Sequence, residues 1–372
     1  MFKKRLAIIV LVIFTIAMFA GCGGTTDTTT AAPAETTAAP TTEGGETTEA
    51  PAETTAPAAD FVPAAEIVAP PGKTLLSLPV DQVSEKPLRI ATIMVQNNPF
   101  GAAVLVGQNA AKEILADRNC VVDAISVEDF DAQKWTSVID NCIATGYDAI
   151  TFFGLSEALK PVVDKGTEAG ILMFSFNTEP GLDSTRVAFY GQDGFAGGQQ
   201  CGTALVELMG GEGKYGIITG DFGVLGHELR RTGARDIFDK EDGMELIGEF
   251  ENNDKAEEAY SVATNMLTAH PDLKGIYVTA GGPSGAAKAI EDAGMVDQVM
   301  LVCHDVLAES APYVASGTIK ACLDQDPFNQ GYQPVVDAFN MLVTGEAPQE
   351  INWYDGVMAT PETVEELFPE LF

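Results

Sequence analysis

Positive charge is scarce in this sequence. The 372 residues include 21 Lys and Arg but 54 Asp and Glu, which gives a formal net charge of −33. A chain this acidic is repelled by phosphate backbones, so the composition argues against nucleic-acid binding. Hydrophobic residues make up 46% of the chain, which is typical of a globular protein and too high for a wholly disordered one. At roughly 100–200 residues per domain, the length favours two domains.

The sequence also lacks the common catalytic and metal-binding motifs. It contains no G-x-S-x-G segment, and Gly211-x-Gly213-x-x-Gly216 precedes a predicted strand instead of following one, which is the wrong context for a dinucleotide site. We therefore expect no metal, no cofactor and no enzymatic activity; an exported α/β hydrolase or oxidoreductase is the alternative of another class. No histidine has another His or Cys at the spacing of a metal site; the three are His227, His270 and His304.

Cysteine is rare, and six residues are too few for a disulfide scaffold in a chain of this length. One of them, Cys22, follows an apolar segment near the start of the chain. The others are odd in number and form no C-x-x-C pair, so we expect buried thiols, although an exported location permits one disulfide between partners that the sequence leaves open. These five are Cys120, Cys142, Cys201, Cys303 and Cys322.

The first 21 residues have the pattern of an export signal. Three basic residues, Lys3–Arg5, precede an apolar run of fourteen residues, Leu6–Phe19, that only Thr15 interrupts. The run is shorter than the ~20 residues that a membrane-spanning helix needs. Small residues follow it, as at a signal-peptide cleavage site.

The segment Phe19-Ala20-Gly21-Cys22 resembles the bacterial lipobox. The resemblance implies cleavage before Cys22 and lipidation of its sulfur. We therefore expect an exported protein that a lipid anchors to the cell membrane on its extracytoplasmic side. The alternative is an ordinary secreted protein in which Cys22 is buried.

Residues 22–60 are rich in Thr, Ala, Pro and Glu and contain no Lys or Arg. Such a segment has little to bury, so we expect a disordered tether. A flexible chain of this length spans about 35 Å root-mean-square. Residues 61–86 form a mixed, Pro-bearing approach segment to which the sequence assigns no position.

From Leu88 onward, short apolar runs alternate with stretches of helical period, which predicts an α/β fold. Ten strands are many for one open sheet, so the pattern favours two doubly wound lobes of parallel sheet. The strands are predicted at 88–95, 120–127, 148–153, 171–176, 186–190, 215–219, 244–250, 275–279, 298–303 and 318–323. The helices are predicted at 101–117, 131–144, 156–169, 193–209, 226–239, 254–269, 283–293, 307–316 and 328–343.

Several of the predicted strands end in polar or aromatic residues. Ligands of such folds bind beyond the carboxyl ends of the strands, so residues at that edge are candidates for one binding site. Planar amide and carboxylate ends can bridge neighbouring hydroxyls of a sugar, and an aromatic ring can stack on its C–H face. The candidates at strand ends are Asn98, Phe100, Phe153, Asn177, Asp305 and Gln325.

Residues 88–345 resemble the type I periplasmic binding proteins of the ribose-binding group, which serve ABC importers. The matching segments are Asn97-Asn98-Pro99-Phe100, Gly146-Tyr147-Asp148-Ala149-Ile150, Glu168-Ala169-Gly170-Ile171, Arg230-x-x-Gly233, Leu267-Thr268-Ala269-His270-Pro271-Asp272 and Asp324-Gln325-Asp326-Pro327. The resemblance implies a monomeric protein that binds a small sugar and delivers it to a membrane permease. Carried over position by position, it implies the ligand-binding residues Asn98, Phe100, Phe153, Asn177, Arg230, Asn253, Asp305 and Gln325.

Two departures from the family pattern argue against ribose itself. Phe153 stands where the family has Asn, and Ala280-Gly281 stands where Asn-Asp is usual. A small polyhydroxylated ligand is still expected. A furanone, a nucleoside or an amino acid is an open alternative, and so is a sensory role in place of transport.

The resemblance also implies how the lobes are built. We expect an N-terminal lobe of residues 87–192 plus 326–352 and a C-terminal lobe of 193–325 plus 353–372. The chain would cross between them near Gly191–Asp193, Gln325–Pro327 and Trp353. Three short connections at one edge would form a hinge that closes on the ligand.

Overall fold

The computed structural model describes residues 61–95, 98–181 and 183–372. The predicted signal peptide, Cys22 and the tether lie outside these residues. Within them, no helix has the length and apolar character needed to cross a membrane. All five cysteines of this part of the chain are buried and free.

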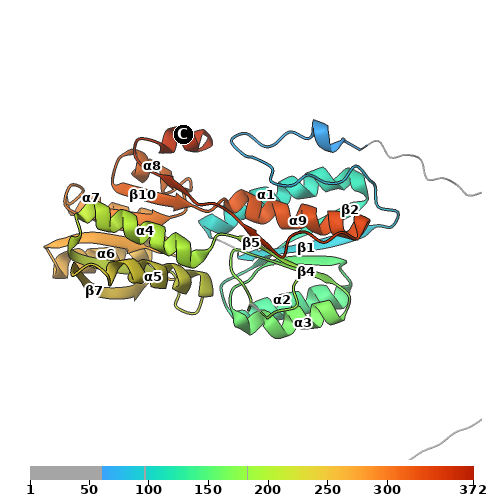
Figure 1. Ribbon diagram of the computed structural model, residues 1–372, viewed down its shortest axis with the longest axis horizontal. Coiled ribbons are helices and arrows are strands. Elements are labelled where there is room, and N and C mark those ends of the chain that lie inside the picture. The colour runs from blue at the N-terminus through green and yellow to red at the C-terminus, as the bar shows by residue number, and fades with distance from the viewer. Residues whose placement is uncertain (1–60, 96–97, 182) are drawn as a thin grey trace, which may run out of the picture. The chain divides into compact units, whose positions relative to one another are not determined.

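The first of two six-stranded sheets is wholly parallel, with strand order β11-β5-β4-β3-β1-β2 (Figure 1). Its central strands bury nearly every residue, as the continuous apolar runs predict for a sheet that helices cover on both faces. The strands are β1 (Leu88–Val95), β2 (Cys120–Val127), β3 (Ala149–Phe153), β4 (Leu172–Phe176), β5 (Ala188–Gly191) and β11 (Ile351–Trp353).

The second sheet has the order β12-β10-β9-β8-β6-β7 and is parallel except for β12, which runs antiparallel to β10. It repeats the wiring of the first sheet, with the earliest strands at one side and a short late strand at the other. The strands are β6 (Glu212–Thr219), β7 (Gly243–Glu251), β8 (Leu273–Val278), β9 (Met300–His304), β10 (Ile319–Asp324) and β12 (Val357–Ala359).

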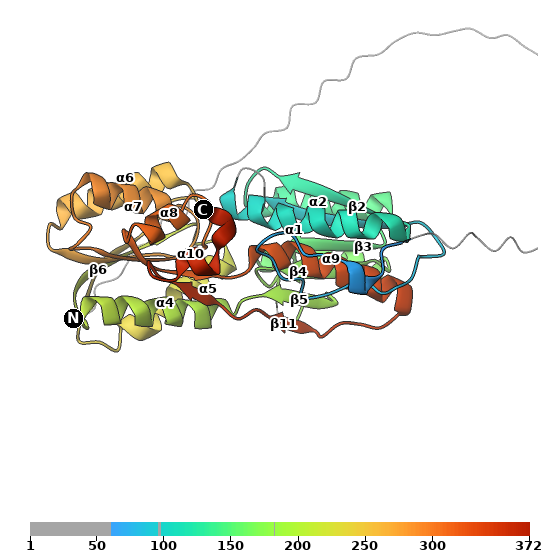
Figure 2. The same cartoon turned by 90° about the horizontal axis from the view of Figure 1, so that it is seen from above.

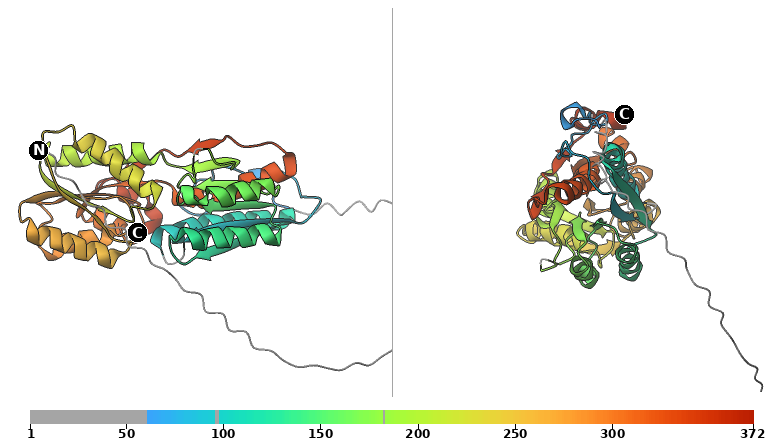
Figure 3. Two further views of the ribbon diagram at one scale, coloured as in Figure 1. Left: turned by 90° about the horizontal axis from the view of Figure 1, so that it is seen from below. Right: turned by 90° about the vertical axis from the view of Figure 1, so that its right-hand side faces the viewer.

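Helices cover both faces of each sheet. On the first sheet α1 and α9 lie on one face, and α2 and α3 lie on the other, which faces the viewer in the left panel of Figure 3. On the second sheet α4 and α5 lie opposite α6, α7 and α8 (Figure 2). The helices are α1 (Pro99–Leu115), α2 (Ala132–Thr145), α3 (Lys160–Glu168), α4 (Gly194–Met209), α5 (Leu225–Phe238), α6 (Ala256–Ala269), α7 (Pro283–Asp292), α8 (Ala311–Ala315), α9 (Pro327–Thr344) and α10 (Val364–Leu367).

This architecture confirms the predicted α/β fold of two parallel-sheet lobes, and each predicted strand is found within a few residues. Two short strands, β11 and β12, were not predicted, because three residues carry too little periodicity to be recognised. Helices α3 and α8 begin later than expected. Pro161 and Pro312 each occupy the second position of their helix, and a proline lacks the N–H that an earlier start would require to bond to the carbonyl four residues before it.

The chain passes between the sheets at three places. After β5 it enters α4, which contacts β8, β9 and β10 of the second sheet. After β10 it enters α9, which contacts β1, β4 and β5 of the first sheet. The last passage is the short link from β11 to β12.

Residues 61–86, which the sequence left unplaced, pack along α9 and the turn after α1. The Val80 amide donates to Asn340 at 2.8 Å, and Asn340 in turn donates to the Leu78 carbonyl at 3.0 Å. Arg118 is fully buried and donates to the carbonyls of Val62 and Val80 at 2.6 and 3.4 Å. These bonds satisfy backbone groups of a segment that has almost no regular structure of its own.

Two glycines set the distance between α1 and α9. A Cβ at Gly331 would lie 2.1 Å from the Val104 carbonyl oxygen, and one at Gly107 would lie 1.9 Å from the Phe328 carbonyl oxygen. Both obstacles are backbone atoms, so a side chain can fit only if the helices move apart. The small residues therefore fix how closely α9 covers the first sheet.

We predict that Gly331→Ala lowers the free energy of unfolding by about 3 kcal/mol, the upper end of the usual range for overpacking, because the backbone of a helix crossing must shift. Urea unfolding measures the change. Gly146→Ala is the control: it has nothing within 4 Å but a φ of +74°, so it should cost only about 1 kcal/mol of backbone strain. A Gly331→Ala protein as stable as the wild type would contradict the crowding argument.

Candidate ligand-binding site

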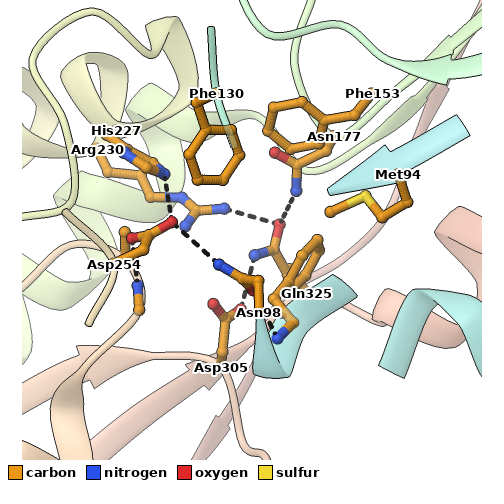
Figure 4. A pocket seen from close by; sticks show the side chains of 13 residues that line it. Met94, Asn98, Phe130, Phe153, Asn177, His227, Arg230, Asp254, Asp305 and Gln325 are labelled. Carbon is orange, nitrogen blue, oxygen red and sulfur yellow. Dashed lines mark hydrogen bonds and ion pairs between the residues drawn. The ribbon is translucent and has the colours of Figure 1, made fainter. Parts of the chain in front are cut away.

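A cavity that is partly open to solvent lies where the carboxyl ends of the two sheets meet (Figure 4). Its wall combines aromatic rings with planar polar groups. The lining residues are Met94, Asn98, Phe100, Phe130, Phe153, Asn177, His227, Arg230, Asp254, Ala280, Gly281, Asp305 and Gln325.

Seven of the eight sequence-predicted residues line this cavity, and Asn253 does not. Asn253 is exposed and donates from its side chain to Glu258 at 2.6 Å. Both Asn253 and Asp254 have left-handed backbone, with φ of 50° and 56°, and it is the second of the two whose side chain lines the cavity. The tight turn after β7 determines which of the two side chains lines the cavity, and the residue types alone do not predict the outcome.

Asn98 connects the start of α1 to the second sheet. Its Oδ1 accepts from the backbone amides of Phe100 and Gly101 at 2.9 and 3.2 Å, which caps the helix. Its Nδ2 donates to Asp254 Oδ2 at 3.3 Å, across the cavity. A residue that begins as a helix cap therefore also presents an amide to the site.

The apolar wall comes from the first lobe, where Phe153 ends β3 and Phe130 lies in the loop after β2. The rings of Phe130 and Phe153 lie 5.7 Å apart and tilted, and Trp135 and Phe176 support Phe153 from behind at 5.8 and 6.3 Å. Phe153 is almost fully buried. Locked rings of this kind offer a fixed face to an apolar surface of a ligand.

Gln325 joins the polar groups of both sheets. Its Oε1 accepts from Arg230 at 2.7 Å and from Asn177 Nδ2 at 3.1 Å, while its Nε2 donates to Asp305 Oδ1 at 2.6 Å. Gln330 approaches the same Oε1 at 3.2 Å. The side chain is buried, and it lies just past β10, where the chain passes between the sheets.

Arg230 and Asp305 place opposite charges in the cavity without touching each other directly. Arg230 also donates to the Thr279 carbonyl at 3.1 Å, and its Nε finds no acceptor among the described residues. Burial raises the pKa of Asp305, and the nearby guanidinium opposes that rise. Because a Cβ at Gly198 would lie 2.1 Å from the Arg230 carbonyl oxygen, the glycine lets α5 approach α4 closely enough to hold Arg230 at the site.

Strained backbone is concentrated around this cavity. Asn177 and Asp305 have φ of 64° and 72°, and Asn253 and Asp254 are also left-handed. Each such residue costs on the order of 1–3 kcal/mol and persists only where the surrounding structure holds it. Strain of this kind is typical of sites where side-chain direction matters more than stability.

The sequence analysis missed four lining side chains: Met94, Phe130, His227 and Asp254. A usable signal existed for His227, which lies three residues before Arg230 and therefore on the same face of α5. Asp254 fills space beside Gly281, where a Cβ would lie 3.1 Å from the Asp254 Cβ. The small residues at 280–281 thus make room for a carboxylate that arrives from another loop.

Comparisons with known proteins agree with this geometry. Residues 92–347 match the family described as "Periplasmic binding protein domain". The D-ribose/D-allose-binding protein of Pseudomonas aeruginosa is 30% identical over 290 residues, which cover 75% of this chain and 89% of that protein. The chain belongs to the type I periplasmic binding protein family.

Other relatives lie in the same group. The D-apiose import binding protein of Paraburkholderia graminis is 30% identical over 250 residues, 67% of this chain and 79% of that protein. A crystal structure of GanP, a glucose-galactose binding protein from Geobacillus stearothermophilus, matches with a TM-score of 0.69 at 24% identity, over 75% of this chain and 99% of that chain; this likeness shows the fold. The family consists of extracytoplasmic binding proteins and not of enzymes, and this group includes sugar-binding proteins of ABC transporters.

We predict that Gln325→Met lowers the free energy of unfolding by about 2–4 kcal/mol, because the apolar side chain removes the donor to the buried Asp305 Oδ1 and the acceptor of Arg230 Nη2. Urea unfolding of the purified protein measures this loss. Gln298→Met, at an exposed position, is the matched control and should change stability little. An equal change in both variants would show that Gln325 does not hold the network together.

Proposed function

We propose that this protein captures a small sugar or a sugar-like polyol between its two lobes and delivers it to an ABC importer. The observation that carries the proposal is the composition of the cavity: planar polar ends from both sheets face a wall of phenylalanine rings. The relatives named above, whose names refer to ribose, allose and apiose, support the same ligand class.

The chemistry of a sugar fits such a wall. Each hydroxyl both donates and accepts, and amide, carboxylate and guanidinium groups can bridge neighbouring hydroxyls. The C–H face of the ring is apolar and can stack on Phe130 or Phe153. Specificity then follows from the cost of leaving a buried polar group unpaired when a hydroxyl is missing.

We further propose that the ligand closes the two lobes, residues 87–192 plus 326–352 and residues 193–325 plus 353–372. A ligand that touches Asn98 and Phe153 on one side and Arg230 and Asp305 on the other binds the closed arrangement more tightly, so it shifts the population toward closure. Gln325, at a passage between the lobes, contacts both sides and can respond to their approach.

Delivery to a permease requires that the protein stay near the membrane. We propose that Cys22 carries the lipid and that residues 22–60 act as the tether of a monomeric binding head. Stable attachment needs more than one acyl chain, since a single chain binds membranes only marginally.

Cys22→Ala should release the protein from the membrane fraction when cells are fractionated. A wild-type protein that is already in the soluble fraction would refute the lipid anchor.

A thermal-shift panel tests the ligand class. The panel contains D-ribose, D-allose, D-apiose, D-arabinose, D-glucose and D-galactose, together with polyols, nucleosides and amino acids. At 100 times its Kd a true ligand stabilises the folded protein by about 2.7 kcal/mol. Stabilisation by an amino acid or nucleoside but by no sugar would overturn the sugar assignment.

Energy transfer between two dyes tests closure. The native thiols at residues 120–322 are buried, so labels can be directed to S137C on α2 and S261C on α6, both at exposed positions. The tightest sugar of the panel should shift the population toward the closed distance. An unchanged distance at saturation would mean either that the apo protein is already closed or that the cavity is not the binding site. Arg230→Ala separates these two explanations, because it should weaken sugar binding only if the sugar binds in the cavity.

A further inference from the structure

His227 and Asp254 face each other on the second-lobe side of the cavity. Their side chains are only 9% and 8% exposed, and His227 Nε2 lies 3.8 Å from Asp254 Oδ2. This separation is too long for a direct hydrogen bond. The pair therefore presents two polar atoms to the cavity that do not satisfy each other.

The surroundings define what each atom can do. His227 Nδ1 accepts from the Asp221 amide at 3.1 Å, so the neutral ring carries its proton on Nε2 and donates there. Asp254 Oδ1 accepts from the Gly281 amide at 2.9 Å. Among the residues that the structure describes, Oδ2 accepts only from Asn98 Nδ2 at 3.3 Å, which leaves Oδ2 with accepting capacity. One side of the gap is a donor and the other is an acceptor.

Gly220 makes this arrangement possible. A Cβ at this position would lie 2.2 Å from Asp254 Oδ1 and 2.6 Å from His227 Cε1. Both side chains therefore pack over a glycine that directly follows β6 and leaves them room. The pair is held in place from three directions: by the Asp221 and Gly281 amides and by the bare backbone of Gly220.

We propose that His227 and Asp254 form a hydroxyl clamp that determines specificity at one position of the ligand. A hydroxyl oxygen that lies beside the gap, on its cavity side and within hydrogen-bond distance of both atoms, accepts from Nε2–H and donates to Oδ2, and few other groups do both. A fluorine or a carbonyl cannot donate, and an ammonium group has no lone pair with which to accept. The assignment rests on the proposed function and adds to it the chemistry required at this one carbon.

Paired substitutions separate the clamp from the fold. His227→Asn places an amide where Nδ1 lies and can still accept from Asp221, but it leaves nothing at Nε2. His227→Gln places an amide nitrogen near the Nε2 position and can still donate. His270→Asn, outside the cavity, is the matched control.

Calorimetry with the tightest sugar of the panel, and with each of its monodeoxy analogues, tests the clamp. His227→Asn should weaken binding by roughly 10- to 100-fold, His227→Gln should weaken it less, and His270→Asn should leave it unchanged. One monodeoxy analogue should bind the wild type weakly and should lose no further affinity in His227→Asn. A purely structural role of His227 would weaken every analogue alike, and that result would overturn the clamp.

The same experiment keeps the two proposals apart. If the wild type binds a sugar and His227→Asn binds it equally well, the clamp is wrong and the proposed function stands. If the wild type binds none of the sugars, both are wrong. Asp254→Asn, which keeps the size of the side chain but replaces an acceptor by a donor, should reproduce the loss seen in His227→Asn.

A second, independent observation concerns residues 61–86, which we call the strap. The strap precedes the family match at residues 92–347, yet it is hydrogen-bonded to the start of α9, just after the passage from β10. Asn329 accepts from the Leu76 amide at 3.2 Å and donates to the Thr74 carbonyl at 2.8 Å and to Asp326 at 2.6 Å. Asn329 is buried, so this end of the strap is fixed to the passage itself.

The strap then reaches the other lobe. Lys73 pairs with Glu370, near the C-terminus, at 2.5 Å, and the two side chains are 28% and 18% exposed. The preceding Gly72 has a φ of +71°, and a Cβ there would lie 2.3 Å from Glu370 Oε2. The chain end that holds Glu370 continues from α10, which contacts α8 of the second lobe.

We infer that the strap is a conformational device that biases the lobes toward the arrangement seen here. It is fixed to the first lobe by several hydrogen bonds and ion pairs, including Ser77 with Asp337 of α9 and Lys86 with Asp148, and to the second lobe by the ion pair of Lys73 with Glu370. Breaking the ion pair removes a link across the passage without removing any group from the cavity. Since the strap directly follows the predicted tether, it also connects the membrane anchor to the moving part of the head.

Charge reversal tests the strap with the S137C/S261C dye pair. Lys73→Glu should shift the apo protein toward longer distances and weaken sugar binding by roughly 2- to 5-fold, the scale of one exposed ion pair. The double variant Lys73→Glu/Glu370→Lys should restore both readouts. Lys274→Glu, which breaks a pair with Glu212 inside the second lobe, is the control. Equal distances and affinities in wild type and Lys73→Glu would overturn the strap.

Discussion

The site depends on one buried neutral amide at a passage between the lobes. Gln325 is long enough to reach both sides, and its two ends have opposite hydrogen-bonding character. Its oxygen accepts from Arg230 and Asn177 and its nitrogen donates to Asp305, so one side chain satisfies groups from both sheets. A charged residue here would add a buried charge, and an apolar one would remove the amide that bonds to both Arg230 and Asp305. The two sheets and their helices place these partners around the Gln325 amide.

The two buried charges at the site do not form a direct ion pair. Arg230 and Asp305 are both buried and both bond to Gln325 instead of to each other. Polar atoms not consumed by an ion pair can turn to a ligand, and Arg230 Nε and Asp254 Oδ2 keep such capacity. The rigid phenylalanine wall opposite excludes water from one face, so each polar contact made inside counts for more than it would in solvent.

The fold could be predicted from the sequence because strands that are buried on both faces appear as continuous apolar runs. The all-buried β3 appears as Ala-Ile-Thr-Phe-Phe, and helices of clear period separate such runs. Residues at strand ends could be predicted for the same reason: once a strand is known, the residues shortly after it lie at the ligand edge of the sheet, as Asn98, Asn177 and Asp305 do.

The features that could not be predicted depend on the backbone conformation of loops. The turn at 253–254 brings Asp254 and not Asn253 to the cavity, Phe130 enters from a loop after β2, and β11 and β12 are too short to leave a pattern. The docking of residues 61–86 was equally hidden, because it relies on individual side chains such as Asn329 and Asn340 that meet backbone groups some 250 positions away.

The most direct measurement is a crystal structure of the protein with the tightest sugar of the panel. The account predicts one sugar molecule in the cavity, with its C–H face on Phe130 or Phe153 and its hydroxyls on groups of both lobes, Arg230 and Asp305 among them. It also predicts that Gln325 still joins the two sides in that complex. A sugar bound outside this cavity, or in contact with one lobe only, would contradict the account.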